Sequence, residues 1–133
     1  MSGIYTKTTN AIKVTVIPTY LDDQSEPEDD HYVWAYTVQV ENLSDASVQL
    51  LNRHWQIMDA LGQVQEVRGA GVVGEQPVLK PGEGFRYTSG TALPTPSGIM
   101  SGQYEMEGAG GTRFPIDIPA FSLDSPHQRT RPN

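Results

Sequence analysis

Apolar and polar residues alternate along most of this chain, which is the pattern of β-strands that bury one face. The alternation is cleanest from Tyr32 to Glu41, and no segment shows the 3.6-residue period of an amphipathic helix. The pattern predicts an all-β protein, a β-sandwich of about seven antiparallel strands. The expected strands cover residues 12–20, 32–41, 48–57, 64–68, 85–89, 100–106 and 114–118.

Glycine and proline mark the connections between these strands. The chain has 13 glycines and 10 prolines, an excess that indicates many turns. Gly108–Gly111 is predicted to be a hairpin turn, because glycine adopts positive φ angles without steric cost. The segment 89–98 contains two prolines and is predicted to be a long loop.

The length of 133 residues fits one domain. We expect this domain to cover residues 1–123, and residues 124–133 to form a disordered tail, because apolar residues end at Leu123. The N-terminus lacks the features of a signal peptide, and no run of about 18 apolar residues is present. The absence of cysteine excludes a disulfide framework, a cysteine zinc site and a cysteine nucleophile. These features predict a cytoplasmic protein without membrane contact.

The segment 102–106 has the spacing of the tyrosine corner found in immunoglobulin-like sandwiches, with Tyr104 as the tyrosine. Met106 stands where an extracellular immunoglobulin domain has its second cysteine. Trp55 or Trp34 is the expected packing partner. The alternative is that Tyr104 is one more alternating core residue.

The net charge of −7 comes almost entirely from one segment. Six of the 16 acidic residues lie between Asp22 and Asp30, and the remaining ten are matched by nine basic residues. An acidic chain without a basic stripe is not expected to bind nucleic acid or an anionic membrane. The acidic segment is predicted to be a solvated loop, with a weak divalent cation site as the alternative, since carboxylates bind Mg²⁺ and Ca²⁺.

Gly69-x-Gly71-x-x-Gly74 matches the glycine spacing of dinucleotide-binding loops. That chemistry needs a helix directly after the glycines, whereas Pro77 and Pro81 prevent a regular helix here. The glycines are therefore predicted to serve a bulge or a tight crossover between strands. A shallow anion site formed by their backbone amides is the alternative.

No catalytic arrangement can be assembled from the sequence. His31, His54 and His127 follow no metal-binding or catalytic spacing, and neighbouring residues on a strand point to opposite faces. We therefore predict no enzyme activity, no catalytic residue, no metal site and no cofactor.

Five ordered motifs occur between residues 52 and 123. They are NRHWxIxD at 52–59, EVxGxGVVGxQP at 66–77, LxPGExFxYxSG at 79–90, LxTPxGxMxGxYxM at 93–106 and FxIxIPxFxL at 114–123. Together they resemble the ApaG family, and the resemblance extends over the chain from about residue 12 to residue 123.

The resemblance implies a fibronectin type III-like sandwich in a small bacterial cytoplasmic protein to which no reaction is assigned. Similar domains in eukaryotes are attached to F-box proteins and to a polymerase-interacting protein, which implies protein binding. The family has been associated with cobalt tolerance and magnesium efflux, which implies a link to Co²⁺ and Mg²⁺ homeostasis. Its glycine signature, here Gly69, Gly71 and Gly74, has been suggested as a pyrophosphate site.

Taken together, these features predict a non-enzymatic module that binds a protein partner through one sheet face or through the loops 69–76 and 89–98. The residues assigned to the first loop are Gly69, Gly71, Val72, Val73, Gly74 and Gln76. The alternative function is a sensor that binds pyrophosphate or a phosphate-rich nucleotide at the Gly69-x-Gly71-x-x-Gly74 loop.

Overall fold

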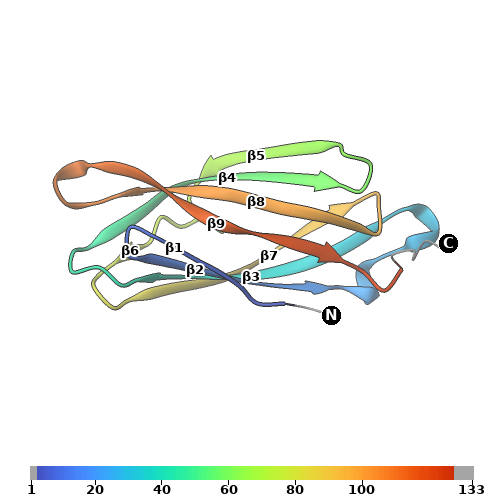
Figure 1. Ribbon diagram of the computed structural model, residues 1–133, viewed down its shortest axis with the longest axis horizontal. Coiled ribbons are helices and arrows are strands. Elements are labelled where there is room, and N and C mark those ends of the chain that lie inside the picture. The colour runs from blue at the N-terminus through green and yellow to red at the C-terminus, as the bar shows by residue number, and fades with distance from the viewer. Residues whose placement is uncertain (1–2, 128–133) are drawn as a thin grey trace.

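The computed structural model describes residues 3–127, which form a sandwich of two antiparallel sheets (Figure 1). Its strands are β1 (Tyr5–Thr9), β2 (Ile12–Tyr20), β3 (Tyr32–Asn42), β4 (Val48–Asp59), β5 (Val64–Ala70), β6 (Val78–Leu79), β7 (Gly84–Leu93), β8 (Ser97–Glu107) and β9 (Arg113–Asp124). One sheet has the order β1-β2-β3-β7. The other has the order β5-β4-β8-β9, and the short β6 also pairs with β4.

The predicted β-sandwich is confirmed, with the seven expected strands and two further short ones. β1 has the sequence YTKTT, whose three central residues are exposed, so it lacks the apolar alternation that identifies a half-buried strand. β6 has only two residues, too few for an alternation to be seen. Both therefore depend on neighbouring strands for their existence.

The prediction of a long loop at residues 89–98, between β7 and β8, is wrong. β7 runs to Leu93 and β8 begins at Ser97, so only residues 94–96 connect them. The pairing partner explains the difference, because Leu93 lies opposite Tyr32 at the first position of the long strand β3. The Gly108–Gly111 connection between β8 and β9 is the short turn that its glycines predict, and contains η3 (Ala109–Gly111).

Alternate residues of the two sheets fill the core, which contains a cluster of aromatic rings. Trp55 lies at its centre, with ring centroids 5.3 Å from Tyr36, 6.4 Å from Tyr104 and 6.0 Å from Phe121. All three contacts are near edge-to-face, the arrangement that aromatic quadrupoles favour. The core therefore links the sheets through rings rather than through a disulfide.

The tyrosine corner is wrong, and the alternative that Tyr104 is an alternating core residue is correct. The Tyr104 hydroxyl hydrogen bonds to the hydroxyl of Tyr87 in the opposite sheet, whereas a tyrosine corner bonds to backbone a few residues upstream. Trp55, one of the two expected packing partners, does contact the Tyr104 ring.

Two register shifts shape the sheet that contains β5. The pairing of β4 with β8 shifts between Leu50 and Asn52, and that of β8 with β9 shifts between Met100 and Gly102. After the first shift, Arg53 lies opposite the buried Tyr104 and faces the interior. The residues on either side of Arg53 consequently face outward.

The acidic segment is the exposed loop that the sequence predicts. It contains two 3-10 turns, η1 (Asp22–Gln24) and η2 (Pro27–Asp29), and a bridge between Glu26 and His31 closes it. It lies at the same end of the sandwich as the β4–β5 hairpin (Figure 1).

Part of the expected C-terminal tail is described. Trp34 Nε1 donates to the carbonyl oxygen of Asp124 at 2.9 Å, and the His127 ring lies 5.9 Å from that of Tyr20. Residues 124–127 therefore pack on the sandwich, and residues 128–133 lie outside the described residues. Within residues 3–127, no helix is long and apolar enough to cross a membrane.

Candidate functional site

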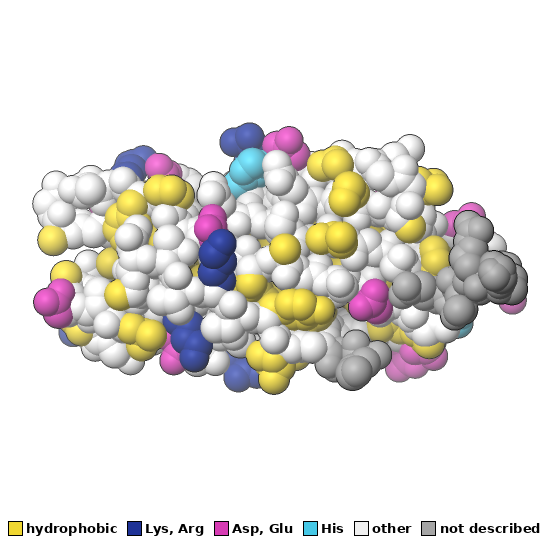
Figure 2. Space-filling model, in the orientation of Figure 1, with side chains coloured by type: hydrophobic (Ala, Val, Ile, Leu, Met, Phe, Trp, Pro, Cys, Tyr) yellow, Lys and Arg dark blue, Asp and Glu magenta, His cyan; other side chains and the backbone are white. Residues whose placement is uncertain are grey.

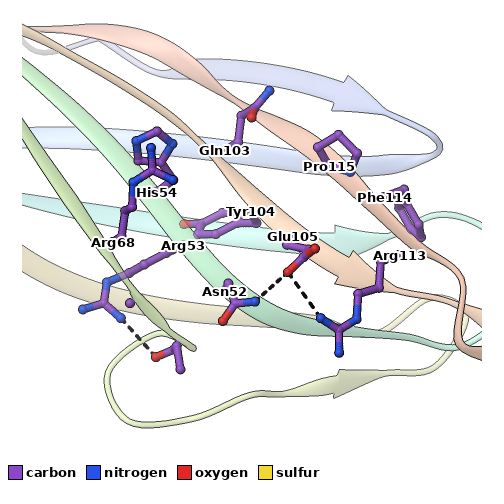
Figure 3. A pocket seen from close by; sticks show the side chains of 12 residues that line it. Asn52, Arg53, His54, Arg68, Gln103, Tyr104, Glu105, Arg113, Phe114 and Pro115 are labelled. Atoms are coloured by element: carbon purple, nitrogen blue, oxygen red, sulfur yellow. Dashed lines mark hydrogen bonds and ion pairs between the residues drawn. The ribbon is translucent and has the colours of Figure 1, made fainter.

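The side chains of β5, β4, β8 and β9 that point away from the core form the outer face of the larger sheet. Near its centre lies an open cleft with a volume of about 710 Å³ (Figure 3). Backbone and side chains of all four strands line it: Asn52, Arg53, His54, Arg68, Gly69, Ala70, Gln103, Tyr104, Glu105, Arg113, Phe114 and Pro115. The candidate site therefore depends on strand pairing rather than on a loop.

Three carboxylates of this face each contact a basic group and a second polar group, and a fourth, Glu107, lies 3.6 Å from Arg113. Glu105 accepts a hydrogen bond from Asn52 Nδ2 at 2.6 Å and lies 3.8 Å from Arg113 (Figure 3). Glu66 lies 3.0 Å from His54 Nε2 and 3.3 Å from Arg68. Glu105 and Glu66 therefore each already face a basic group and a second polar group of this chain.

The third carboxylate, Asp117, accepts from Gln103 at 3.0 Å and pairs with Lys7 of β1 at 3.0 Å. Hydrogen bonds from Gln103 and Lys7 lower the pKa of Asp117, and those from His54 and Arg68 lower the pKa of Glu66. Both carboxylates are therefore charged at neutral pH. Because basic and acidic side chains alternate across the face, their charges balance and do not form a positively charged anion-binding site.

Arg53 faces the interior behind the cleft. Its Nη1 donates to the carbonyl oxygens of Ala70 at 3.1 Å and Gly71 at 2.9 Å, so it ties β4 to the end of β5. Its charge acts on the buried tyrosine hydroxyls, but burial is the larger effect, and the pKa values of Tyr87 and Tyr104 are raised. These tyrosines are therefore neutral core groups at physiological pH.

An exposed apolar row crosses the outer face between the cleft and the β4–β5 hairpin. Met58 lies opposite both Val64 on β5 and Ile99 on β8, and their exposed fractions are 39%, 57% and 46%. Leu61 at the hairpin is 75% exposed. We call Met58, Leu61, Val64 and Ile99 the apolar strip. Figure 2 shows hydrophobic side chains gathered over this end of β4 and β5.

The glycine motif has a structural explanation at each position. A Cβ at Gly69 would come within 2.9 Å of the Arg53 guanidinium, and one at Gly71 would overlap the carbonyl of Glu75. Gly71 and Gly74 also have φ values of +66° and +81°. The three glycines therefore allow a close approach and a tight turn.

Hydrogen bonds within the chain occupy several amides of this loop. Gly71 donates to Leu51 at 2.8 Å, while Val72 and Glu75 donate to each other's carbonyl oxygens at 2.8 and 2.9 Å. Gln76 is also held in place, because its side chain donates to the Leu51 carbonyl at 2.9 Å. These amides are already paired and do not converge on a free space.

The two valines assigned to this loop differ in accessibility. The side chain of Val72 is fully buried in the core, whereas Val73 is 55% exposed. A partner at this loop would therefore meet Val73 and not Val72.

The structure does not bring the histidines together. His54 lies on the outer face beside Glu66, His31 closes the acidic loop, and His127 packs against Tyr20 near Asp22. Within residues 3–127, no group of three histidine, aspartate or glutamate side chains could hold a metal ion.

The sequence contained a signal for the apolar strip that strand alternation alone overlooks. Ile57-Met58 and Ile99-Met100 are adjacent apolar pairs within strands, so one member of each must face away from the core. The cleft has no comparable signal, because its residues come from four strands and are polar like those of any solvated face.

These features define a small β-sandwich whose outer sheet face is partly charged and partly apolar. A family model described as the ApaG domain matches residues 22–108. The chain is 64% identical over 130 residues to Protein ApaG of Paramagnetospirillum magneticum, covering 98% of this chain and 100% of that one. It is 62% identical over 130 residues to Protein ApaG of Rhodospirillum centenum, with the same coverage. The chain belongs to the ApaG family, which confirms the resemblance.

Solved structures agree with this assignment. A crystal structure of a Bordetella pertussis protein named ApaA has a TM-score of 0.85 and 48% identity, covering 88% of this chain and 95% of that one. The C-terminal domain of wzt has a TM-score of 0.56 at 9% identity, covering 95% of this chain and 80% of that one. The second likeness shows a shared fold alone.

Proposed function

We propose that this ApaG-family chain is a non-enzymatic module that binds a protein partner through the outer face of its larger sheet. The observation that carries the proposal is the apolar strip, in which Met58, Val64 and Ile99 are adjacent on three paired strands. Contiguous exposed apolar surface bordered by polar groups is typical of protein interaction sites. The strip therefore replaces the loops 69–76 and 89–98 as the proposed contact surface.

The charge network beside the strip supports the same function. The ion pairs of Glu66, Asp117 and Glu105 are exposed, so they contribute little to stability but can select a partner of complementary charge pattern. An apolar centre with a charged border is the usual composition of a reversible interface. The lack of cysteine fits a module that works in the cytoplasm. In this proposal, the protein affects Co²⁺ and Mg²⁺ homeostasis through the activity of its partner.

Affinity capture with a matched pair of variants tests this function. Met58→Thr with Ile99→Thr removes apolar surface from the strip and retains residues that favour strands. Ile17→Thr makes the same kind of change on the outward face of the other sheet and is the control. Proteins retained by the wild type and by Ile17→Thr should be lost with the double variant. Retention of the same proteins by all three would overturn the assignment of this surface.

A further inference from the structure

β5 has one edge that no other strand of residues 3–127 covers. It is the terminal strand of its sheet, and Figure 1 shows it at the upper margin of the sandwich. Six of its seven residues are exposed. Natural proteins usually protect such an edge with proline, with charged side chains, especially lysine, or with a bulge. VQEVRGA contains no proline or lysine, its two charged residues have opposite signs, and its pairing with β4 has no register shift. The edge is therefore able to accept another strand.

The backbone groups of β5 point alternately toward β4 and toward this free edge, because hydrogen-bonded and non-hydrogen-bonded positions alternate in an antiparallel pair. The Asp59 amide donates to the Gln63 carbonyl at 3.0 Å. At the other end of the ladder, the Gly71 amide donates to the Leu51 carbonyl at 2.8 Å. The odd-numbered residues of β5 thus bond to β4 in the observed register. The residues whose amides and carbonyls point to the free edge are Val64, Glu66, Arg68 and Ala70.

We propose that this edge pairs antiparallel with the same edge of a second copy, with Val67 on the two-fold axis. A two-fold axis at Val67 places Glu66 of each copy opposite Arg68 of the other. It also places Val64 opposite Ala70. All four of these residues have outward-pointing backbone groups, so the two Glu66–Arg68 pairs can each exchange the two hydrogen bonds of a regular ladder. At the ends of the ladder, the Ala70 carbonyl already accepts from Arg53 Nη1 at 3.1 Å and would be shared between two donors.

Charge selects this register over its neighbours. An axis at Glu66 would place the two Glu66 carboxylates opposite each other, and an axis at Arg68 would do the same to the two arginines. Like charges directly opposite on a sheet destabilise it, whereas opposite charges stabilise it. Both side chains have room for a new contact, because Glu66 is 49% and Arg68 71% exposed.

Self-pairing also covers apolar surface. Val67, which is 39% exposed on the inward side of β5, would contact its own copy across the axis. Val64, 57% exposed, would contact Ala70. The two larger sheets would then form one continuous sheet. This proposal does not depend on the apolar strip binding another protein.

Charge exchange tests the pairing, with the association constant measured by sedimentation equilibrium up to about 1 mM protein. Glu66→Arg and Arg68→Glu each turn two opposite-charge pairs into like-charge pairs. We expect either change to weaken self-association by about tenfold or more. An equimolar mixture of the two variants should associate again, because the two arginines that one chain then carries at positions 66 and 68 face the two glutamates of the other chain. The double variant E66R/R68E should also associate.

Association restored in the mixture would show that the charges act between chains. Within each single variant, the ion pair between positions 66 and 68 is still lost, so restoring that internal contact cannot explain the rescue. Amide hydrogen exchange is the second measurement. Glu66 and Arg68 amides should become protected as protein concentration rises, while the Val67 amide is protected throughout. A wild type that stays monomeric at about 1 mM, or association that both single variants leave unchanged, overturns the proposal.

Discussion

The hydroxyl groups of Tyr87 and Tyr104 hydrogen bond to each other inside the core, Tyr87 from the smaller sheet and Tyr104 from the larger one. Both side chains are buried, and burial raises both pKa values. The pair supplies each hydroxyl with a partner where water is excluded, which is the condition for burying a polar group. It thereby joins the two sheets behind the candidate site.

Removing one hydroxyl of this pair should destabilise the protein. Tyr87→Phe leaves the Tyr104 hydroxyl buried without a partner, so we expect a loss of about 1–3 kcal/mol in the free energy of unfolding, measured in urea. The double variant Y87F/Y104F should lose less than the sum of the two single variants, because no orphaned hydroxyl remains. Tyr5→Phe, in a partly buried ring outside the pair, is the control. Additive losses would contradict this coupling.

Stability should fall as pH rises above about 10. Tyr87 and Tyr104 have raised pKa values in the folded state, whereas the unfolded tyrosines ionise near 10.0. The stabilisation is therefore complete below pH 10 and decreases above it, because the unfolded state then loses protons that the folded state keeps. Each tyrosine contributes a slope of up to about 1.4 kcal/mol per pH unit. Urea unfolding between pH 8 and pH 11 measures how the free energy of unfolding depends on pH. The double variant Y87F/Y104F should lose stability less steeply than the wild type. An unchanged slope would show that these two tyrosines do not cause the decline.

Val73 is strained and should be replaceable with a gain in stability. It has a φ of 43° and precedes Gly74 at 81°, so the two occupy a turn in which both central residues have positive φ. Asn-Gly is the favoured pair in such turns, whereas a β-branched residue is unfavourable there. We expect Val73→Asn to raise the free energy of unfolding by about 1 kcal/mol. Val72→Asn, which buries an amide in the core, should lower it by about 2–3 kcal/mol.

Gly102 is required by the close approach of β8 to β4. A Cβ there would overlap the backbone carbonyl of His54, and backbone cannot move aside as a flexible side chain can. Gly102→Ala should destabilise the fold by about 1–3 kcal/mol and perturb the outer face around His54. Gly90→Ala is the matched control, because its Cβ would make only an ordinary contact with Trp34 at 3.4 Å. Thermal unfolding compares the two; equal stability would show that the strands separate without cost.

Pyrophosphate should leave the amide signals of the glycine motif unchanged. Gly71 and Val72 already donate hydrogen bonds to carbonyls of this chain, and Gly69 lies within the β4–β5 ladder. Titration with pyrophosphate to about 10 mM, followed by ¹H–¹⁵N spectra, measures this. Shifts centred on Gly69, Gly71 and Gly74 would instead support the phosphate-rich nucleotide sensor.

Local residue patterns were sufficient for most of the fold. Strand alternation depends only on which side chains must leave water, so the seven longer strands are visible in it. β1 and β6 are not, because their pairing with β2 and β4 defines them rather than an apolar face of their own. The loop predicted from Ser89 to Gly98 is wrong for the same reason, since pairing with β3 extends β7 to Leu93.

The sequence by itself determined the all-β class, the Gly108–Gly111 turn and the family. It also required some exposed apolar surface. Ile57 and Met58 are neighbours on one strand, as are Ile99 and Met100 on another, so only one residue of each pair can face the core. Only the tertiary structure decided that Met58, Val64 and Ile99 form a single row and that Val72 is buried while Val73 is exposed. The register of β4 with its neighbours controls the first outcome and is set by contacts between residues distant in the chain. The backbone angles of the turn at Val73 and Gly74 control the second.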